Sequence, residues 1–125
     1  DRRAALAATA LELIAAPDLA PLFGPGSQAE VAVAGAVTLP DGAVRSVLGR
    51  IDRLAIGPDR ILFADIKTSG RLRPRDLVQL ALYRALLADI FPGRSVTAMV
   101  LHTADARAEI VDAERLAAAL AAAPA

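Results

Sequence analysis

Hydrophobic positions gather in three consecutive stretches of the first half of the chain. Residues 30–39, 44–56 and 60–68 are typical of strands, with alternating hydrophobic and polar positions over residues 44–56, and Pro40-Asp41-Gly42 and Gly57-Pro58-Asp59 separate them as turns. Short turns between successive strands favour antiparallel neighbours. The pattern therefore predicts a three-stranded meander.

Helical patterns flank these strands. Residues 4–16 are rich in strong helix formers and end at Pro17, and a loop follows over residues 17–27. Pro74 is well placed in the first turn of a second helix that runs to about Ile90. A second helix after the meander makes an all-β fold untenable.

The remaining residues predict two more strands and a last helix. Residues 95–103 form a fourth strand, residues 107–111 a fifth, and residues 113–123 an alanine-rich helix. The fourth strand follows a helix, so it is expected to return beside the third strand by a right-handed crossover. The fold class is therefore α/β (α+β), with a mixed central sheet flanked by helices.

Length and composition narrow the class of protein. With 125 residues, 55% of them hydrophobic, the chain has the size of one domain, so residues 1–125 are predicted to fold as a single unit. The absence of cysteine excludes disulfides and thiol chemistry. No apolar run is long enough for a membrane span, which predicts a cytoplasmic protein without a membrane partner. Because the chain begins at Asp1, we expect it to be an excerpt of something longer.

Charge is balanced overall but not along the chain. Residues 45–75 hold eight basic and three acidic residues, a local charge of +5 in a chain of net charge zero. This segment is either an ordinary solvated surface or a face that contacts phosphates. On the second interpretation the DNA-binding residues are Arg50, Arg53, Arg71, Arg73 and Arg75.

The third predicted strand carries an acid and an amine on one face. Asp65 and Lys67 are two residues apart and point the same way, and Lys67 is the one lysine beside thirteen arginines. Asp52 lies on the preceding strand, and two carboxylates on adjacent strands suit Mg²⁺ or Mn²⁺, with the backbone oxygen of Ile66 as a third ligand. The alternative is a plain ion pair between Asp65 and Lys67 at a strand end.

Other polar residues have two interpretations each. Glu30 opens the first strand and is either solvated or close enough to Asp52 and Asp65 to complete a metal site. Gln79 and Tyr83 lie on one side of the second helix, where both could belong to a functional site. The alternative for Tyr83 is that it is a core residue. His102 lies in a predicted strand, which favours a structural role as a hydrogen-bonded residue of the sheet over a catalytic role.

Four motifs in order resemble the PD-(D/E)XK nuclease superfamily. They are Glu30, then Gly49-Arg50-Ile51-Asp52, then Asp65-Ile66-Lys67-Thr68, then Gln79-Leu80-Ala81-Leu82-Tyr83. Within that superfamily they are most similar to the RecB-like nuclease domain, in particular the C-terminal nuclease domain of bacterial helicase-nuclease subunits of the AddA type. The resemblance spans roughly residues 28–101 and implies a restriction-endonuclease-like fold.

The resemblance also implies a function. It implies a magnesium-dependent exonuclease, with Mn²⁺ as a substitute metal, that hydrolyses DNA phosphodiesters during double-strand break repair and recombination. By position, Asp52 and Asp65 would ligate the metal, Glu30 would complete the site, and Lys67 would activate water and stabilise phosphate charge. Gln79 and Tyr83 would position these groups. The implied partners are DNA, a helicase domain of the same full-length chain and a second helicase-nuclease subunit.

One departure from the family keeps two other functions open. RecB-like members often carry a histidine on a helix ahead of these motifs, whereas no histidine precedes Glu30 here. The chain is therefore alternatively a catalytically inert nuclease-like fold that binds DNA, or one that docks a partner subunit through its Ala/Leu-rich helices.

Overall fold

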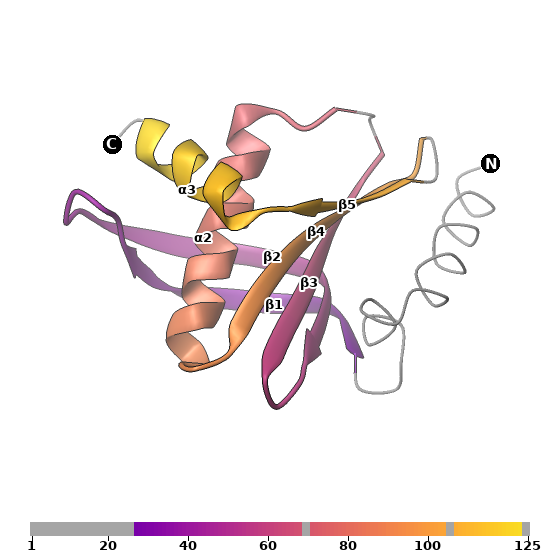
Figure 1. Cartoon of the computed structure of the whole chain (residues 1–125), viewed down its shortest axis with the longest axis horizontal. Coiled ribbons are helices and arrows are strands. Elements are labelled where there is room, and N and C mark those ends of the chain that lie inside the picture. The colour runs from indigo at the N-terminus through magenta and orange to yellow at the C-terminus, as the bar shows by residue number, and fades with distance from the viewer. Residues whose placement is uncertain (1–26, 69–70, 105–106, 124–125) are drawn as a thin grey trace.

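A single five-stranded sheet organises the chain. The structure, a computed structural model, describes residues 27–68, 71–104 and 107–123 (Figure 1). The strands lie in the sheet in chain order, and two helices are described with them. The elements are β1 (Ser27–Thr38), β2 (Val44–Ile56), β3 (Arg60–Lys67), α2 (Pro74–Ile90), β4 (Ser95–His102), β5 (Arg107–Val111) and α3 (Ala113–Ala122).

The strand directions confirm the predicted mixed sheet. The pairs β1/β2, β2/β3 and β4/β5 are antiparallel, whereas β3 and β4 are parallel and joined by α2. A parallel pair needs a crossover, which α2 provides. The fold class is therefore α/β (α+β), as predicted. Both described helices belong to one core cluster and pack on the same face of the sheet.

The predicted boundaries agree closely with the structure. Helix α2 and strands β2 and β5 have the predicted bounds, and β3, β4 and α3 each end one residue early. Strand β1 begins three residues before the predicted start and ends one residue sooner. The predicted helix over residues 4–16 lies outside the described residues, as does nearly all of the loop over residues 17–27.

Both faces of the central strands are buried, which explains their nearly continuous apolar sequence. On β3, Ile61 and Phe63 face α2, while Leu62 and Ala64 belong to a smaller cluster on the opposite face. The larger cluster includes the ring of Tyr83, which packs edge-on against Phe63 at a centroid distance of 6.4 Å. The polar ends of β3 and α2 are thus supported by a packed core.

The β1–β2 hairpin extends past the end of β3 and lies beside α2 (Figure 1). Strand β2 pairs with β3 only over Arg53–Ile56, while its N-terminal half pairs with β1 alone. The hairpin comes so close to α2 that a Cβ atom at Gly49 would collide with the Tyr83 hydroxyl. The glycine of the Gly49-Arg50-Ile51-Asp52 motif is therefore explained by packing. No helix among the described residues is long and apolar enough to cross a bilayer.

Candidate active site at the end of β3

A local slip in strand alternation positions Asp52. Ile51 and Leu54 both pack in the cluster beneath α2 although they are three residues apart, so the regular alternation of β2 shifts by one between them. The β1/β2 ladder lacks a pair at Glu30 and Asp52, and Glu30 has a positive φ of 53°. The irregularity is therefore shared by both strands, and it turns Asp52 toward β3.

The side chain of Asp52 takes the place of the β2 backbone as the hydrogen-bond acceptor for the end of β3. Its Oδ2 accepts the Ile66 N–H at 2.7 Å, just beyond the last β2/β3 pair, Arg53 with Ala64. Its carboxylate also lies close enough to the Asp65 side chain to raise the pKa of Asp65. In an extended strand the N–H and C=O of one residue point to the same neighbour, so the Ile66 carbonyl is directed to the same side as the two carboxylates.

The closeness of the two carboxylates changes their chemistry. Burial and the neighbouring Asp52 together raise the pKa of Asp65 to about 6, although the positive charge of Lys67 acts in the opposite direction. Two neighbouring carboxyls that resist ionising together are suited to bind a cation between them. Mg²⁺ is commonly held by one or two carboxylates together with water and substrate phosphates. The donor set formed by Asp52 and Asp65 therefore fits a hard divalent cation.

Lys67 lies between Asp65 and a third aspartate from α2. Its Nζ is 3.5 Å from Asp65 Oδ2 and 2.7 Å from Asp76 Oδ1. Partial burial by itself would lower the pKa of Lys67, but the hydrogen bond to Asp76 and the charge of Asp65 outweigh it and raise the pKa. The ammonium therefore stays protonated. We call Asp52, Asp65, Lys67 and Asp76 the carboxylate site.

Asp76 connects this site to the start of α2. Its Oδ2 accepts the Arg73 N–H at 2.8 Å, in the manner of an N-terminal cap, while Oδ1 binds Lys67. Burial alone would raise the pKa of Asp76, but the hydrogen bonds from Lys67 and from the Arg73 backbone lower it. Asp76 is thus an ionised anchor that holds the Lys67 ammonium against the helix.

The backbone of Lys67 is held from the other side by β4. The Lys67 carbonyl accepts both the Thr103 N–H at 2.9 Å and the Thr103 hydroxyl at 3.1 Å, and Thr103 is buried. Two donors on one carbonyl restrict the end of β3, where the ladder to β2 has already ended. Lys67 is therefore restrained through its side chain by Asp76 and through its backbone by Thr103.

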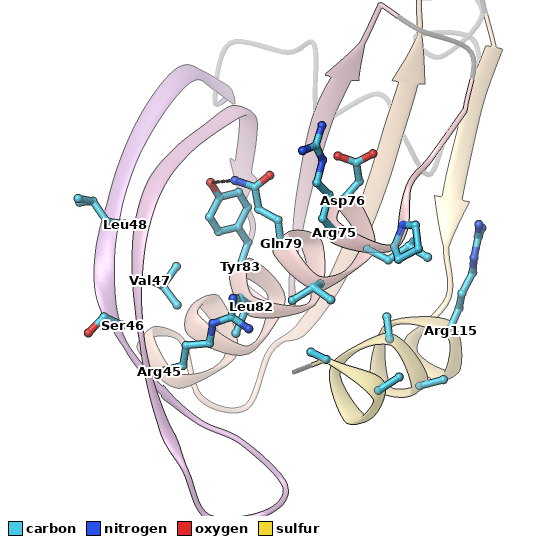
Figure 2. A pocket seen from close by; sticks show the side chains of 17 residues that line it. Arg45, Ser46, Val47, Leu48, Arg75, Asp76, Gln79, Leu82, Tyr83 and Arg115 are labelled. Carbon is cyan, nitrogen blue, oxygen red and sulfur yellow. Dashed lines mark hydrogen bonds between the residues drawn. The ribbon is translucent and has the colours of Figure 1, made fainter. Parts of the chain in front are cut away.

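Gln79 and Tyr83 are brought together as predicted. Gln79 Nε2 donates to the Tyr83 hydroxyl at 2.9 Å, as Figure 2 shows, and Gln79 lies one turn after Asp76 on α2. The Tyr83 ring is buried in the core and its hydroxyl meets β2 at Gly49. Tyr83 is therefore a core residue through its ring, while its hydroxyl forms a hydrogen bond with Gln79.

Glu30 is the predicted ligand that the structure does not gather with the others. It lies between the register pairs Ala29 with Arg53 and Val31 with Ile51, where the β1/β2 ladder has no pair, and its side chain is exposed. Within residues 27–68, 71–104 and 107–123, no group of three or more acidic or histidine side chains is arranged to hold a metal ion. The protein side chains that fit a cation here are therefore Asp52 and Asp65.

The predicted DNA-binding arginines fall into two places. Arg71, Arg73 and Arg75 are exposed around the start of α2, next to the carboxylate site. Arg50 is exposed on β2, whereas Arg53 is half-buried and donates to Ser27 Oγ at 3.0 Å. The three arginines near α2 are thus better placed to contact a polyanion at this site than Arg53.

His102 belongs to a second charged cluster on the same face of the sheet. Its Nε2 lies 2.9 Å from Glu109 Oε1, as expected for a hydrogen-bonded sheet histidine, but its buried Nδ1 has no hydrogen-bond partner among the described residues. Glu109 also contacts Arg107 at 3.4 Å and Arg115 at 2.9 Å. The hydrogen bond from His102 lowers the pKa of Glu109, against a smaller opposing effect of burial. We call these four residues the Glu109 cluster.

Sequence reasoning missed Asp76, Thr103 and Glu109. The sequence does contain a signal for Asp76. An acidic residue three positions after the residue that precedes Pro74 is typical of a side chain that caps the start of a helix. No comparable local signal marks Thr103 or Glu109, since their partners lie on other strands. Their roles follow from the strand pairing.

Comparison with known proteins adds no family assignment. No family model matches the chain, and no curated protein does. Among solved structures, SSO0001 matches with 17% identity and a TM-score of 0.44, over 89% of this chain and 61% of that chain. The chain thus spans less than two thirds of the length of SSO0001, and the likeness is too distant to indicate a function.

Proposed function

We propose that this chain is a magnesium-dependent deoxyribonuclease domain of the RecB-like type in the PD-(D/E)XK superfamily. The observation that carries the proposal is the closeness of the Asp52 and Asp65 carboxyls, which raises the pKa of Asp65, with the Lys67 ammonium 3.5 Å from Asp65. Two carboxylates and one ammonium at a strand end form a site for a divalent cation beside a group that attracts a phosphate. The order of the four motifs along the chain agrees with this assignment.

Each residue of the site has a role in phosphodiester hydrolysis. Asp52 and Asp65 would hold Mg²⁺, which supplies a Lewis acid for the phosphoryl oxygen and lowers the pKa of water. The ammonium of Lys67 meets the negative charge that develops on the phosphate. Asp76 and Thr103 keep Lys67 at the end of β3, while Gln79 and Tyr83 orient the groups that approach from α2.

The arginines near the start of α2 would guide DNA to this site. Arg71, Arg73 and Arg75 are exposed and close in sequence to Asp76. Contacts with phosphates are independent of base sequence and weaken as salt rises. The proposed reaction is exonucleolytic cleavage during double-strand break repair and recombination, together with a helicase domain of the same protein and a second helicase-nuclease subunit.

Cleavage of end-labelled single-stranded DNA tests the proposal. The 125-residue chain is expected to cleave with Mg²⁺ or Mn²⁺ and not with EDTA. Lys67→Ala and Asp65→Asn are each expected to reduce the rate by about 100-fold or more, since both remove charge from the reacting centre. Asp59→Asn, an exposed aspartate in the β2–β3 turn, is the matched control and should cleave like the parent chain.

Metal binding supplies a readout that does not depend on cleavage. Mg²⁺ or Mn²⁺ that binds the folded state is expected to raise the melting temperature of the parent chain and of Asp59→Asn, but not that of Asp65→Asn. Equal metal-induced stabilisation of all three proteins would contradict the assignment of Asp65 as a ligand.

A second candidate function is DNA binding without cleavage. It is favoured by the gathering of two carboxylates rather than three among the described residues, and by the short ion pair that engages Lys67 with Asp76. This alternative predicts salt-sensitive DNA binding that is indifferent to Mg²⁺. Metal-dependent cleavage that requires Lys67 decides against it.

A further inference from the structure

A groove of about 900 Å³ runs between β2, α2 and α3. Its apolar walls are formed by Val47, Val78 and Leu82 from β2 and α2, opposite a row of alanines on α3 and at its end, Ala118, Ala119, Ala122 and Ala123. In Figure 2, Arg45 and Val47 point from β2 toward α2, whereas Ser46 and Leu48 point away. Asp76, Gln79 and Tyr83 line the groove, whereas Asp52, Asp65 and Lys67 do not, so the groove borders the carboxylate site and shares Asp76 with it.

The distribution of apolar residues around α2 is typical of a helix that is packed against other elements on more than one side. Four consecutive residues, Leu80 to Tyr83, are buried, and successive residues of a helix are 100° apart, so apolar side chains surround the helix. A helix that is apolar on every side is typical of a position inside a core. In the described chain, the half-buried Val78 and the buried Leu82, 7% exposed, form the floor of the groove.

The chemistry of the groove favours a protein segment over nucleic acid. The outer surface of a nucleic acid is made of phosphates and sugars, which do not cover an aliphatic floor. Base stacking needs an exposed aromatic face, but the Tyr83 ring is 4% exposed and packs on Phe63.

The charged residues that line the groove indicate which charge a bound molecule should carry beside its apolar surface. Arg45, Arg75 and Arg115 contribute positive charge to the lining, and Arg115 also binds Glu109. Asp76 is the acidic residue among the described lining residues, and its carboxylate is engaged by Lys67 and the Arg73 N–H. The groove therefore complements an aliphatic stripe flanked by carboxylates.

We propose that this groove docks an amphipathic helix of a partner protein, whose aliphatic stripe lies on Val78, Leu82 and the α3 alanines and whose acidic flanks meet Arg45 and Arg75. Such a helix binds through side chains at i, i+3, i+4 and i+7. The small alanine side chains of α3 allow the backbone of the partner helix to approach closely. The inference does not depend on the proposed nuclease function.

Synthetic peptides test this inference on the whole chain. Three labelled helical peptides are compared by fluorescence anisotropy. The first carries a leucine stripe with glutamate flanks, the second the same stripe with lysine flanks, and the third glutamate flanks with serine in place of leucine. The first is expected to bind saturably and about tenfold or more tightly than either of the others, because docking needs both the apolar stripe and the complementary charge.

Variants locate the binding to the groove. Ala118 lines the groove and Ala117 does not, although both are exposed on α3. Ala118→Glu is expected to weaken the first peptide about tenfold or more, whereas the charge-matched Ala117→Glu leaves it unchanged. The double variant Arg45→Glu with Arg75→Glu should prefer the lysine-flanked peptide. Thermal melting confirms that each variant is folded.

Several outcomes would overturn the inference. They are absence of saturable binding by the first peptide, equal affinity for all three peptides, and equal effects of Ala118→Glu and Ala117→Glu. A short single-stranded DNA whose binding is weakened about tenfold by Ala118→Glu and not by Ala117→Glu would instead assign the groove to nucleic acid.

Discussion

Two charged clusters lie on the same face of the sheet, and they differ in how their charges are balanced. The carboxylate site has three aspartates for one lysine, whereas the Glu109 cluster has one glutamate for a histidine and two arginines. Register places them close together, since Lys67 pairs with His102 on β4 and His102 with Arg107 on β5. The two clusters therefore share a location and a scaffold.

The pKa shifts reflect this difference in balance. Burial and Asp52 raise the pKa of Asp65 to about 6, whereas the hydrogen bond from His102 lowers that of Glu109. The carboxylate of Glu109 is stabilised by the groups around it. The ionised form of Asp65 is destabilised unless a proton or a metal cation binds between Asp52 and Asp65. A cluster in which carboxylates outnumber the neighbouring cations is typical of a functional site, whereas a carboxylate fully compensated by cations is typical of a structural ion pair.

Glu109→Ala is expected to have the largest effect on stability. The change leaves the buried His102 ring, 1% exposed, without an acceptor at Nε2, in addition to the unpartnered Nδ1. Loss of a partner for a buried polar group costs about 1–3 kcal/mol. Urea unfolding measures this loss. Glu109→Gln retains an acceptor oxygen and should cost less, and equal stability of Glu109→Ala and the parent chain would contradict a structural role.

Asp65→Asn is expected to change stability in the opposite direction. The variant removes a carboxylate whose ionisation is unfavourable in the folded chain, and the amide can donate a hydrogen bond to Asp52. The gain near neutral pH is on the order of 1–2 kcal/mol. The same urea unfolding experiment measures it, with Asp59→Asn as the matched control. A destabilised Asp65→Asn would mean that the ion pair with Lys67 outweighs the repulsion from Asp52.

The pH dependence of stability should separate the two clusters. The carboxyl of Asp65 loses its proton near pH 3.8 in the unfolded chain and near pH 6 in the folded chain, so its contribution to stability falls as pH rises between these values. The stability gap between Asp65→Asn and the parent chain should therefore widen across that window and then level off. Glu109, with a lowered pKa, contributes stability that is present above pH 4.5 and is lost on acidification.

Parallel unfolding curves at several pH values measure this gap. A gap that stays constant across the window would contradict a raised pKa at Asp65.

Thr103→Val is expected to have the smallest effect on stability. The change removes the hydroxyl donor to the Lys67 carbonyl and leaves the backbone donor in place, at a cost of about 0.5–1.5 kcal/mol. If Thr103 positions Lys67 for catalysis, the cleavage rate should fall more than this stability loss explains. Thr103→Ser, which keeps the hydroxyl, should restore both. A variant that lowers stability but leaves cleavage unchanged would assign Thr103 to the structure alone.

Several features of the site could be predicted because they depend on one regular element. The alternation of β3 indicates that Phe63, Asp65 and Lys67 share a face, and Phe63 does pack beneath α2. The four-residue spacing of Gln79 and Tyr83 predicts their contact on α2, which the structure confirms with a hydrogen bond of 2.9 Å. In each case the period of one helix or strand determines where the side chains point.

Other features depend on how separate elements meet. Strict alternation of β2 would place Asp52 and Ile51 on opposite faces, and the slip that carries Asp52 beside Asp65 arises where β1 and β2 lose their pairing. The ion pair of Lys67 with Asp76 joins β3 to α2, and the pair of His102 with Glu109 joins β4 to β5. Spacing along the chain carries no information on these distances.

The sequence alone determined the strands, the crossover helix and the candidate residues Asp65, Lys67, Gln79 and Tyr83, because local periodicity and turn residues specify each of them. Only the tertiary structure decided which acids meet. It joined Asp52 to Asp65 and Asp76 to Lys67, and it left the Glu30 carboxylate exposed. The physical reason is that register and packing between elements, rather than the period within one of them, set the distance between charges that are remote in sequence.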